Sequence, residues 1–250
     1  MTETEKKTAV VTGAASGIGK ATVITLLKRG FNVSALDIDS KGLEDLFKSL
    51  NVEENTCDIY TTNVASRNEC HSTIAQIYDE NGRIDVLANV AGIARSEHLT
   101  EVSEDSWNQM LDVNLSGVFW CSQAAIPHLI QTNGSLINVA SCSGLMGQAY
   151  TVAYSATKGA VIAMTKSMAM EYIKSNIRIN AVAPGSVNTK LIDNYSIPDD
   201  VNMDLIKPYM GFRGMAEPEE ISNVISFLVS DDAKRIHGAV ITVDGGLTAG

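Results

Sequence analysis

A tyrosine and a lysine four residues apart are the first side chains in this sequence that could carry out a reaction. Tyr154 and Lys158 stand in "YSATK", and on a helix both would project from one face. An ammonium group beside a phenol favours the phenolate, so such a tyrosine could exchange a proton with an alcohol or a carbonyl near neutral pH. An ordinary amphipathic helix would also carry this pair, and Tyr150, one turn earlier, competes for the same role.

A serine at the end of an apolar run could supply a hydroxyl to the same reaction. The segment 134–141 is typical of a buried strand, and Ser141 is its last residue. Ligands of open α/β sheets bind outside the carboxyl ends of the strands, so the Ser141 hydroxyl could hold a substrate oxygen. Ser143 lies two positions away and is an equally plain candidate, and serines in turns are common.

A glycine-rich loop near the start of the chain could bind a phosphate-bearing cofactor. Gly13, Gly17 and Gly19 follow a strand-like run and precede a helix-like one, so a helix N-terminus with free N–H groups would face a pyrophosphate. Their spacing is G-x3-G-x-G, which differs from the G-x-G-x-x-G of the standard dinucleotide fingerprint. Asp37 ends the next strand-like run, where a carboxylate can accept hydrogen bonds from ribose hydroxyls and repel a 2′-phosphate. With no Arg or Lys in 37–40, the pattern favours NAD over NADP, although a simple glycine turn and a turn aspartate remain the alternatives.

The elements that must position these residues form an alternating α/β pattern. Each connecting stretch is long enough for a crossover helix, and several strands are apolar on both faces, as a covered parallel sheet requires. We therefore predict one domain over 1–250, a Rossmann fold with a doubly wound, parallel, seven-stranded sheet and helices on both faces. The predicted strands are 8–12, 32–37, 55–63, 84–90, 134–141, 177–184 and 238–245. The irregular region at about 185–216 is the predicted substrate lid, and a helix is expected to start near Pro218.

Composition excludes several other classes of protein. The formal net charge of −10, with Lys and Arg scattered, argues against a nucleic-acid partner. No apolar run approaches the roughly 20 residues of a membrane span, and the start lacks a signal sequence, so we expect a cytoplasmic protein with no membrane partner. The four cysteines, without CxxC spacing, fit buried thiols, and the four histidines lack ligand spacing, so no metal is expected. The acidic stretch 96–107 is best explained as a solvated helix start with Ser103 as its N-cap.

Taken together, the ordered motifs resemble those of the classical short-chain dehydrogenase/reductase family over essentially the whole chain. The matching segments are "TGAASGIG" (12–19), "NVAG" (89–92), "NLSGVF" (114–119), "YSATK" (154–158), "PGSVNT" (184–189) and "VDGG" (243–246). In that family the active-site serine lies 13 residues before the tyrosine, which selects Ser141 with Tyr154 over Ser143 and Tyr150.

The resemblance implies a catalytic tetrad of Asn114, Ser141, Tyr154 and Lys158. Tyr154 would be the acid/base, Ser141 would orient the substrate oxygen, and Lys158 would favour the phenolate and bind the nicotinamide ribose. Asn114 would hold a water that links Lys158 to solvent. By the same resemblance, cofactor contacts would come from Gly13, Ser16, Gly17, Ile18, Gly19, Asp37, Ile38, Asn63, Val64, Asn89, Ala91, Gly92, Tyr154, Lys158, Pro184, Gly185, Val187 and Thr189, the last to the carboxamide.

Two residues depart from the family pattern. Asn63 stands where the family often has an Asp that contacts the adenine amino group; its amide oxygen can still accept that bond, without charge. Val90 replaces the second Asn of the N-N-A-G element, which mainly braces the sheet, so we expect local repacking and retained activity.

Substrate class is predicted from the lid region, which is apolar with few cations. Its apolar residues include Leu191, Ile192, Tyr195, Met203, Leu205, Ile206, Tyr209, Met210 and Phe212. We therefore expect an NAD-dependent oxidoreductase acting on an aliphatic, cyclic or steroidal secondary alcohol and its ketone. The alternatives are a 3-oxoacyl thioester (acyl-carrier-protein) reductase and, in another class, a non-catalytic cofactor-binding sensor. Met164, Met168 and Met170 lie near helical spacing on the long helix that in the resembled family packs in a four-helix subunit interface, which implies a homotetramer.

Overall fold

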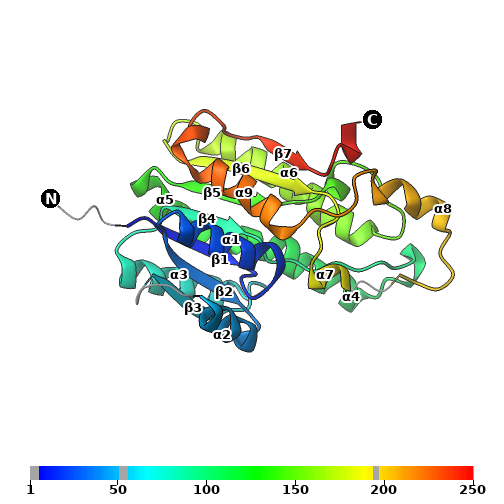
Figure 1. The fold of residues 1–250 in the computed structure, drawn as a ribbon, viewed down its shortest axis with the longest axis horizontal. Helices are drawn as coiled ribbons and strands as arrows, with labels where there is room; N and C mark the ends of the chain where they lie inside the picture. Colours follow the sequence, from blue (N-terminus) through cyan, green and yellow to red (C-terminus); the bar gives the residue numbers. More distant parts are fainter. Residues whose placement is uncertain (1–5, 51–55, 194–196, 250) are drawn as a thin grey trace.

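The protein is built on one parallel sheet, described by a computed structural model over residues 6–50, 56–193 and 197–249. The strand order is β3-β2-β1-β4-β5-β6-β7, and every neighbouring pair runs parallel (Figure 1). The strands are β1 (Thr8–Thr12), β2 (Asn32–Asp37), β3 (Cys57–Thr61), β4 (Val86–Asn89), β5 (Ser135–Val139), β6 (Arg178–Pro184) and β7 (Val240–Val243). This confirms the predicted doubly wound α/β fold.

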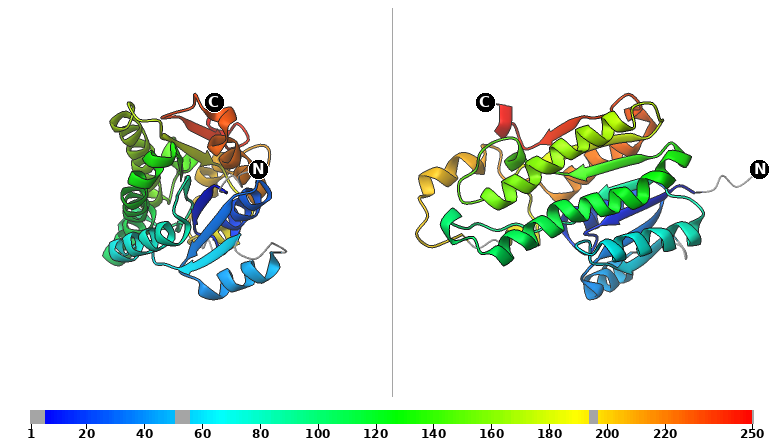
Figure 2. Two further views of the ribbon diagram at one scale, coloured as in Figure 1. Left: turned by 90° about the vertical axis from the view of Figure 1, so that its left-hand side faces the viewer. Right: turned by 180° about the vertical axis from the view of Figure 1, so that it is seen from behind.

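Helices cover both faces of the sheet, as Figure 2 shows. One face carries α1 (Gly17–Lys28), α2 (Ser40–Ser49) and α9 (Pro218–Val229), and the other carries α3 (Arg67–Asn81), α5 (Gly117–Thr132) and α6 (Val152–Glu171). Successive strand residues point to opposite faces. In β1, accordingly, Val11 belongs to the apolar cluster with Leu26 of α1, and Val10 to the cluster with Ile74 of α3. The apolar runs of the sequence thus fill two cores, one on each side of the sheet.

Five of the predicted strands are longer than the hydrogen-bonded strands of the structure. The predictions 55–63, 84–90, 134–141, 177–184 and 238–245 shorten to β3, β4, β5, β6 and β7. At Val90 the physical reason is visible, because its N–H donates to the Thr12 hydroxyl at 3.0 Å instead of to a strand carbonyl. Asn55 lies outside the described residues.

The strand order creates a crevice where the chain changes direction. From β1 the sheet grows outward through β2 and β3, and it then grows in the opposite direction from β4. Connections on opposite sides leave an opening at the carboxyl ends of β1 and β4, which is where sheets of this kind bind ligands.

The remaining elements are short and lie mainly at this edge. They are α4 (Glu104–Leu111), a π-helical turn (Asp112–Ser116), α7 (Lys190–Asp193), α8 (Met203–Ile206) and 3-10 turns at Leu99–Glu101, Cys142–Gly144, Lys207–Met210, Asp231–Ala233 and Leu247–Ala249. The segment between β6 and α9, which includes α8, extends beyond the carboxyl end of the sheet (Figure 1). Pro218 opens α9, as predicted, and Ser103 caps α4 through a 3.0 Å bond from the Ser106 N–H.

Two further observations bear on the class of protein. All four cysteines are free thiols buried in the fold, as expected. Within the described ranges, the helices are too short or too polar to cross a lipid bilayer.

Candidate functional site

The glycine loop after β1 is packed so closely that side chains would not fit. Gly13 has a φ of +68°, and a Cβ there would lie 2.8 Å from the Ala91 Cα. A Cβ on Gly19 would come within 1.9 Å of the Gly13 carbonyl oxygen. The predicted tight turn and the close approach of helix α1 to β1 are therefore both present, and they depend on glycine.

The N-terminus of α1 is open to a ligand. Ser16 occupies the N-cap position, but within the described residues its side chain makes no capping hydrogen bond. The first N–H groups of a helix need partners, and together with the positive end of the helix dipole they suit an anion. The residues present therefore fit the pyrophosphate of a dinucleotide.

Asp37 braces the glycine loop from the end of β2. One carboxylate oxygen accepts the Ala15 N–H at 2.9 Å and the other accepts the Asp39 N–H at 3.0 Å. Each oxygen of a carboxylate can accept two hydrogen bonds. Asp37 thus has a structural role in the loop and keeps acceptor capacity for ribose hydroxyls.

A groove of about 730 Å³ runs from the glycine loop to the loops after β3 and β4. Most of the predicted cofactor residues line it: Gly13, Ser16, Gly17, Ile18, Gly19, Asp37, Ile38, Asn63, Val64, Ala91, Gly92 and Thr189. Segments from five parts of the chain therefore meet in one ligand-sized depression.

On the far side of this groove, Asn63 and Asn89 are engaged within the protein. The Asn63 side-chain oxygen accepts the Ala65 N–H at 3.0 Å, which shapes the loop after β3. Asn89 is buried, and its side-chain amide donates to Ser122 and Asn138 at 3.1 and 2.9 Å. Its side chain braces the sheet and stands outside the groove lining, so a cofactor contact from Asn89 would have to come from its backbone.

The loop after β4 is positioned by a residue that sequence reasoning missed. The Thr12 hydroxyl oxygen accepts the N–H groups of both Val90 and Ala91, at 3.0 and 3.1 Å. Val90 packs against the apolar core on the α1 side of the sheet. Backbone contacts to Thr12 hold this loop without help from a side chain at position 90.

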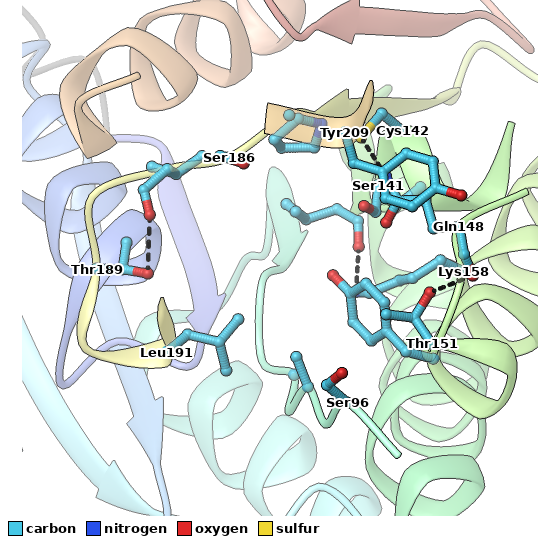
Figure 3. A pocket seen from close by; sticks show the side chains of 18 of the residues that line it. Ser96, Ser141, Cys142, Gln148, Thr151, Lys158, Ser186, Thr189, Leu191 and Tyr209 are labelled. Carbon is cyan, nitrogen blue, oxygen red and sulfur yellow. Dashed lines mark hydrogen bonds between the residues drawn. The ribbon is translucent and has the colours of Figure 1, made fainter. Parts of the chain in front are cut away.

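A second cavity, of about 250 Å³, adjoins the groove at the carboxyl ends of β5 and β6. Ser141, Tyr154 and Lys158 line it, with Pro184, Gly185, Val187 and Thr189 from the turn after β6. In Figure 3, Thr189 and Leu191 face Lys158 and Thr151 across the opening. The cavity therefore joins the predicted nicotinamide turn to the predicted catalytic residues.

Ser141 is oriented by its neighbour Ser143. The Ser141 hydroxyl oxygen accepts the Ser143 hydroxyl at 2.9 Å and the Ser143 N–H at 3.2 Å. Ser141 lines the cavity, whereas Ser143 is 3% exposed and stands behind it. With its oxygen accepting both bonds, Ser141 can direct its own proton toward a substrate oxygen.

Lys158 is buried beneath Tyr154 on the same face of α6. Its ammonium nitrogen lies 5.7 Å from the centre of the Tyr154 ring and donates to the Val139 carbonyl oxygen at 2.9 Å. Burial lowers the pKa of this ammonium from its usual 10.5 to about 8, because a low-dielectric environment disfavours the charged form. At neutral pH the ammonium is still protonated and can favour a phenolate at Tyr154.

Asn114 is completely buried within the π-helical turn before α5. Its side-chain oxygen accepts the Ile93 N–H at 2.8 Å, and its amide donates to the Ile93 carbonyl at 2.8 Å and to the Thr157 hydroxyl at 3.3 Å. A Cβ on Gly92 would lie 3.2 Å from the Asn114 oxygen and 3.4 Å from the Lys158 nitrogen. The structure thus brings the side chains of Asn114 and Lys158 together beside Gly92, with Lys158 lining the cavity and Asn114 behind the lining.

Tyr150, the competing tyrosine, is turned toward the lid segment. Its hydroxyl oxygen accepts the Asn202 N–H at 2.9 Å, and it stands outside the lining of the cavity. Gln148 lines the cavity although sequence reasoning did not select it. Its side chain carries no spacing signal, because the fold alone brings 148 and the lid residue Tyr209 to one cavity.

Several lid residues also line the cavity, among them Leu191, Ile206, Tyr209 and Met210. Phe212 is fully exposed, and Met203 and Leu205 also stand outside the lining, so these three apolar residues of the predicted lid do not line the cavity. Tyr195 lies outside the described residues. Within the described ranges, no group of three or more His, Cys, Asp or Glu side chains is placed to hold a metal ion.

Comparison with known proteins identifies what this chain is similar to. Residues 13–248 match the family described as enoyl-(acyl carrier protein) reductase. A 3-oxoacyl-(acyl-carrier-protein) reductase from Thermotoga maritima is 39% identical, over 97% of this chain and 98% of that protein. A meso-2,3-butanediol dehydrogenase from Serratia marcescens is 35% identical, over 98% and 96% respectively.

Solved structures show the same fold with cofactors bound. A 4-hydroxyisoleucine dehydrogenase complexed with NADH is 34% identical and superposes with a TM-score of 0.86, over 98% of this chain and all of that one. Among the similar structures some hold NADH and others hold NADP or NADPH.

Proposed function

This chain belongs to the classical short-chain dehydrogenase/reductase family of oxidoreductases, and from that premise we propose that it transfers hydride between NAD and a neutral secondary alcohol or its ketone. The observation that carries the proposal is the meeting of Ser141, Tyr154 and Lys158 in one cavity beside the glycine-loop groove. Bound in that groove, the dinucleotide would supply a nicotinamide carbon that accepts or gives the hydride.

The protein's part in the reaction is to position the substrate oxygen and to move its proton. Ser141, held by Ser143, donates a hydrogen bond to that oxygen. Tyr154 takes the proton from an alcohol or returns it to a ketone, and the Lys158 ammonium stabilises the phenolate formed in the first case. Asn114 holds the loop at Ile93 and would position the water through which Lys158 exchanges protons with solvent.

The substrate is inferred to be neutral because the cavity offers a charged substrate group little to bind. Among its described lining residues, Lys158 is the one with a formal charge, and it lies under Tyr154. A carboxylate or phosphate placed among Ile93, Ile206 and Met210 would lose hydration without gaining a partner. An aliphatic, cyclic or steroidal secondary alcohol meets these conditions.

NAD is proposed in preference to NADP because of Asp37. Its carboxylate lies at the end of β2 in the wall of the groove, where a 2′-phosphate would meet a negative charge. Residues 38–40 bring no cation to balance it.

A second candidate is a 3-oxoacyl thioester reductase. The 39% identity to a reductase of this kind favours it, and a thioester is also neutral. Asp37 argues against a reductase of this kind that depends on NADPH, because its carboxylate repels the 2′-phosphate.

A substrate panel separates these candidates. Purified protein is incubated with NAD, and NADH absorbance is followed with aliphatic, cyclic and steroidal secondary alcohols and with 3-hydroxyacyl thioesters. Turnover confined to one chemical group identifies the substrate class. Absence of turnover, with NADH still bound, would contradict the proposal and favour a non-catalytic, cofactor-binding protein.

We also propose a cytoplasmic homotetramer assembled through α5 and α6. Met164 and Met168 pack within the protein, but Met170 is 68% exposed, and Phe119 and Ile173 are 42% and 55% exposed on the same side of the sheet. Apolar side chains of this size are typically covered in an interface. Light scattering coupled to gel filtration measures the mass and tests the assembly.

A further inference from the structure

Tyr150 has a backbone conformation that its side chain does not favour. Its φ is +62°, and of the described non-glycine residues only Asn133 shares a positive φ. A bulky residue in this region is strained by about 1 to 3 kcal/mol, and such strain persists where the surroundings over-determine it. The conformation of Tyr150 therefore requires an explanation in its contacts.

Those contacts fasten the lid segment by two reciprocal tyrosine hydrogen bonds. The Tyr150 hydroxyl oxygen accepts the Asn202 N–H at 2.9 Å. In the opposite direction, the Tyr209 hydroxyl oxygen accepts the Ala149 N–H at 2.9 Å. We call these two contacts between 149–150 and 202–209 the tyrosine clasp.

A third segment supports the clasp from the loop after β4. The Glu97 N–H donates to the Tyr150 carbonyl at 2.8 Å, and the His98 ring meets the Tyr150 ring edge-on with centroids 5.1 Å apart. His98 also contacts the Asp200 carboxylate at 2.8 Å. Two other parts of the chain, 97–98 and 200–202, thus converge on Tyr150.

The fastened segment forms one wall of the substrate cavity. Ile197, Ile206, Tyr209 and Met210 all line the cavity, opposite the groove for the dinucleotide. Figure 3 shows Tyr209 among the side chains around this cavity. Because Asn202 lies between Ile197 and Ile206, a bond at its N–H anchors the segment that carries both side chains.

From this geometry we propose that Tyr150 is a positioning residue that holds the 197–210 segment closed over the substrate and so limits the size of the alcohol or ketone accepted. Its ring supports His98, its hydroxyl holds Asn202, and its carbonyl fixes the loop at Glu97. Tyr150 itself stays outside the reaction, four residues before Tyr154. The effect on substrate choice rests on the proposed function, whereas the effect on the segment does not.

Two variants separate the contributions of Tyr150. Tyr150→Phe keeps the ring and removes the hydroxyl that accepts the Asn202 N–H. Tyr150→Gly removes the whole side chain at a position where glycine adopts the positive φ without steric cost. Tyr78→Phe is the matched control, because Tyr78 gives its hydroxyl to Gln131 on the α3–α5 surface.

Amide hydrogen exchange tests the clasp without any substrate. We expect exchange at 200–206 to be about three- to tenfold faster in Tyr150→Phe, the change expected from losing one hydrogen bond, and faster still in Tyr150→Gly. Exchange in α6 and β5 and in the control should match the parent protein. Unchanged exchange at 200–206 would overturn the proposal.

Steady-state kinetics with an active alcohol from the panel test the effect on substrates. In both variants KM should rise about three- to tenfold while kcat stays within about twofold. The ratio of kcat/KM for a bulkier homologue to that for the preferred substrate should also rise. Faster exchange with an unchanged KM and an unchanged size preference would overturn the positioning role. If the parent protein oxidises no alcohol on the panel, the proposed function fails, and hydrogen exchange still decides the clasp.

Discussion

The Ser143 hydroxyl donates to the Ser141 hydroxyl oxygen at 2.9 Å, so the serine that faces the cavity is held by the serine behind it. Ser143→Ala should remove one of the two hydrogen bonds that orient Ser141 and lower kcat about three- to tenfold, with KM for NAD unchanged. Ser141→Ala should lower kcat about 100-fold or more.

The double variant is the sharper measurement. If Ser143 acts through Ser141, Ser141→Ala with Ser143→Ala should be no slower than Ser141→Ala alone. Ser72→Ala on the exposed surface of α3 is the control. If the losses of kcat in the two single variants add up in the double variant, Ser143 has a role separate from Ser141.

Removal of the Tyr154 hydroxyl tests the acid/base. Tyr154→Phe should lower kcat about 100- to 10,000-fold, which is the usual contribution of a positioned proton donor or acceptor. NADH binding, followed by fluorescence titration, should be retained because the groove is otherwise intact. Unchanged turnover would exclude Tyr154 from the reaction.

The cofactor preference is tested at Asp37. The parent protein should bind NADH more tightly than NADPH, because the carboxylate repels the 2′-phosphate. Asp37→Asn keeps an oxygen that can accept the Ala15 N–H and removes the negative charge. It should raise the affinity for NADPH relative to NADH about tenfold or more, as measured by titration of both. Tighter NADPH binding by the parent protein would contradict the choice of NAD.

The buried ammonium of Lys158 should make the stability of the free protein depend on pH. Its pKa is lowered to about 8 in the folded protein, so the unfolded chain binds more protons between about pH 8 and pH 10.5. Below this window the folded state carries the full cost of burying the charge, about 3 kcal/mol, and above it the cost is gone.

Lys158→Met removes the charge and keeps much of the volume. The free energy of unfolding of this variant should exceed that of the parent at pH 7, and the difference should shrink as the pH rises through 8 toward 10.5. Denaturant unfolding at several pH values measures it. The variant loses the bond to the Val139 carbonyl, which reduces the gain equally at every pH. A difference that does not change with pH would contradict the assignment.

The fold and the two halves of the site were predictable because they depend on local patterns. Gly13 and Gly19, between a predicted strand and a predicted helix, indicate a tight loop. Tyr154 and Lys158 are four residues apart, so they share a face of any helix that contains both. The position of Asp37 beside the groove was predictable because Asp37 is the last residue of the apolar run that forms β2. These features depend on the periodicity of apolar residues and on glycines at positions where a side chain would not fit.

Other features depend on contacts between distant segments, which spacing does not encode. Val90 leaves the ladder because Thr12, 78 positions away, accepts its N–H. Tyr150 and Tyr154 are one helical turn apart in sequence, and only the packing of 202–209 shows that they serve different partners. The sequence around Ser143 does not predict that its hydroxyl donates to the Ser141 oxygen.

The pairing of β1 with β4 has a consequence for how the chain must be made. β1 is an interior strand of the sheet, yet its second neighbour begins at Val86, with Ala9 opposite it. During synthesis from the N-terminus, β1, β2 and β3 emerge first and leave one edge of β1, fully apolar at Val10 and Val11, without a partner until Asn89 has left the ribosome. Open strand edges recruit other chains. The nascent chain therefore carries an open apolar strand edge over the interval in which α3 and β4 are translated.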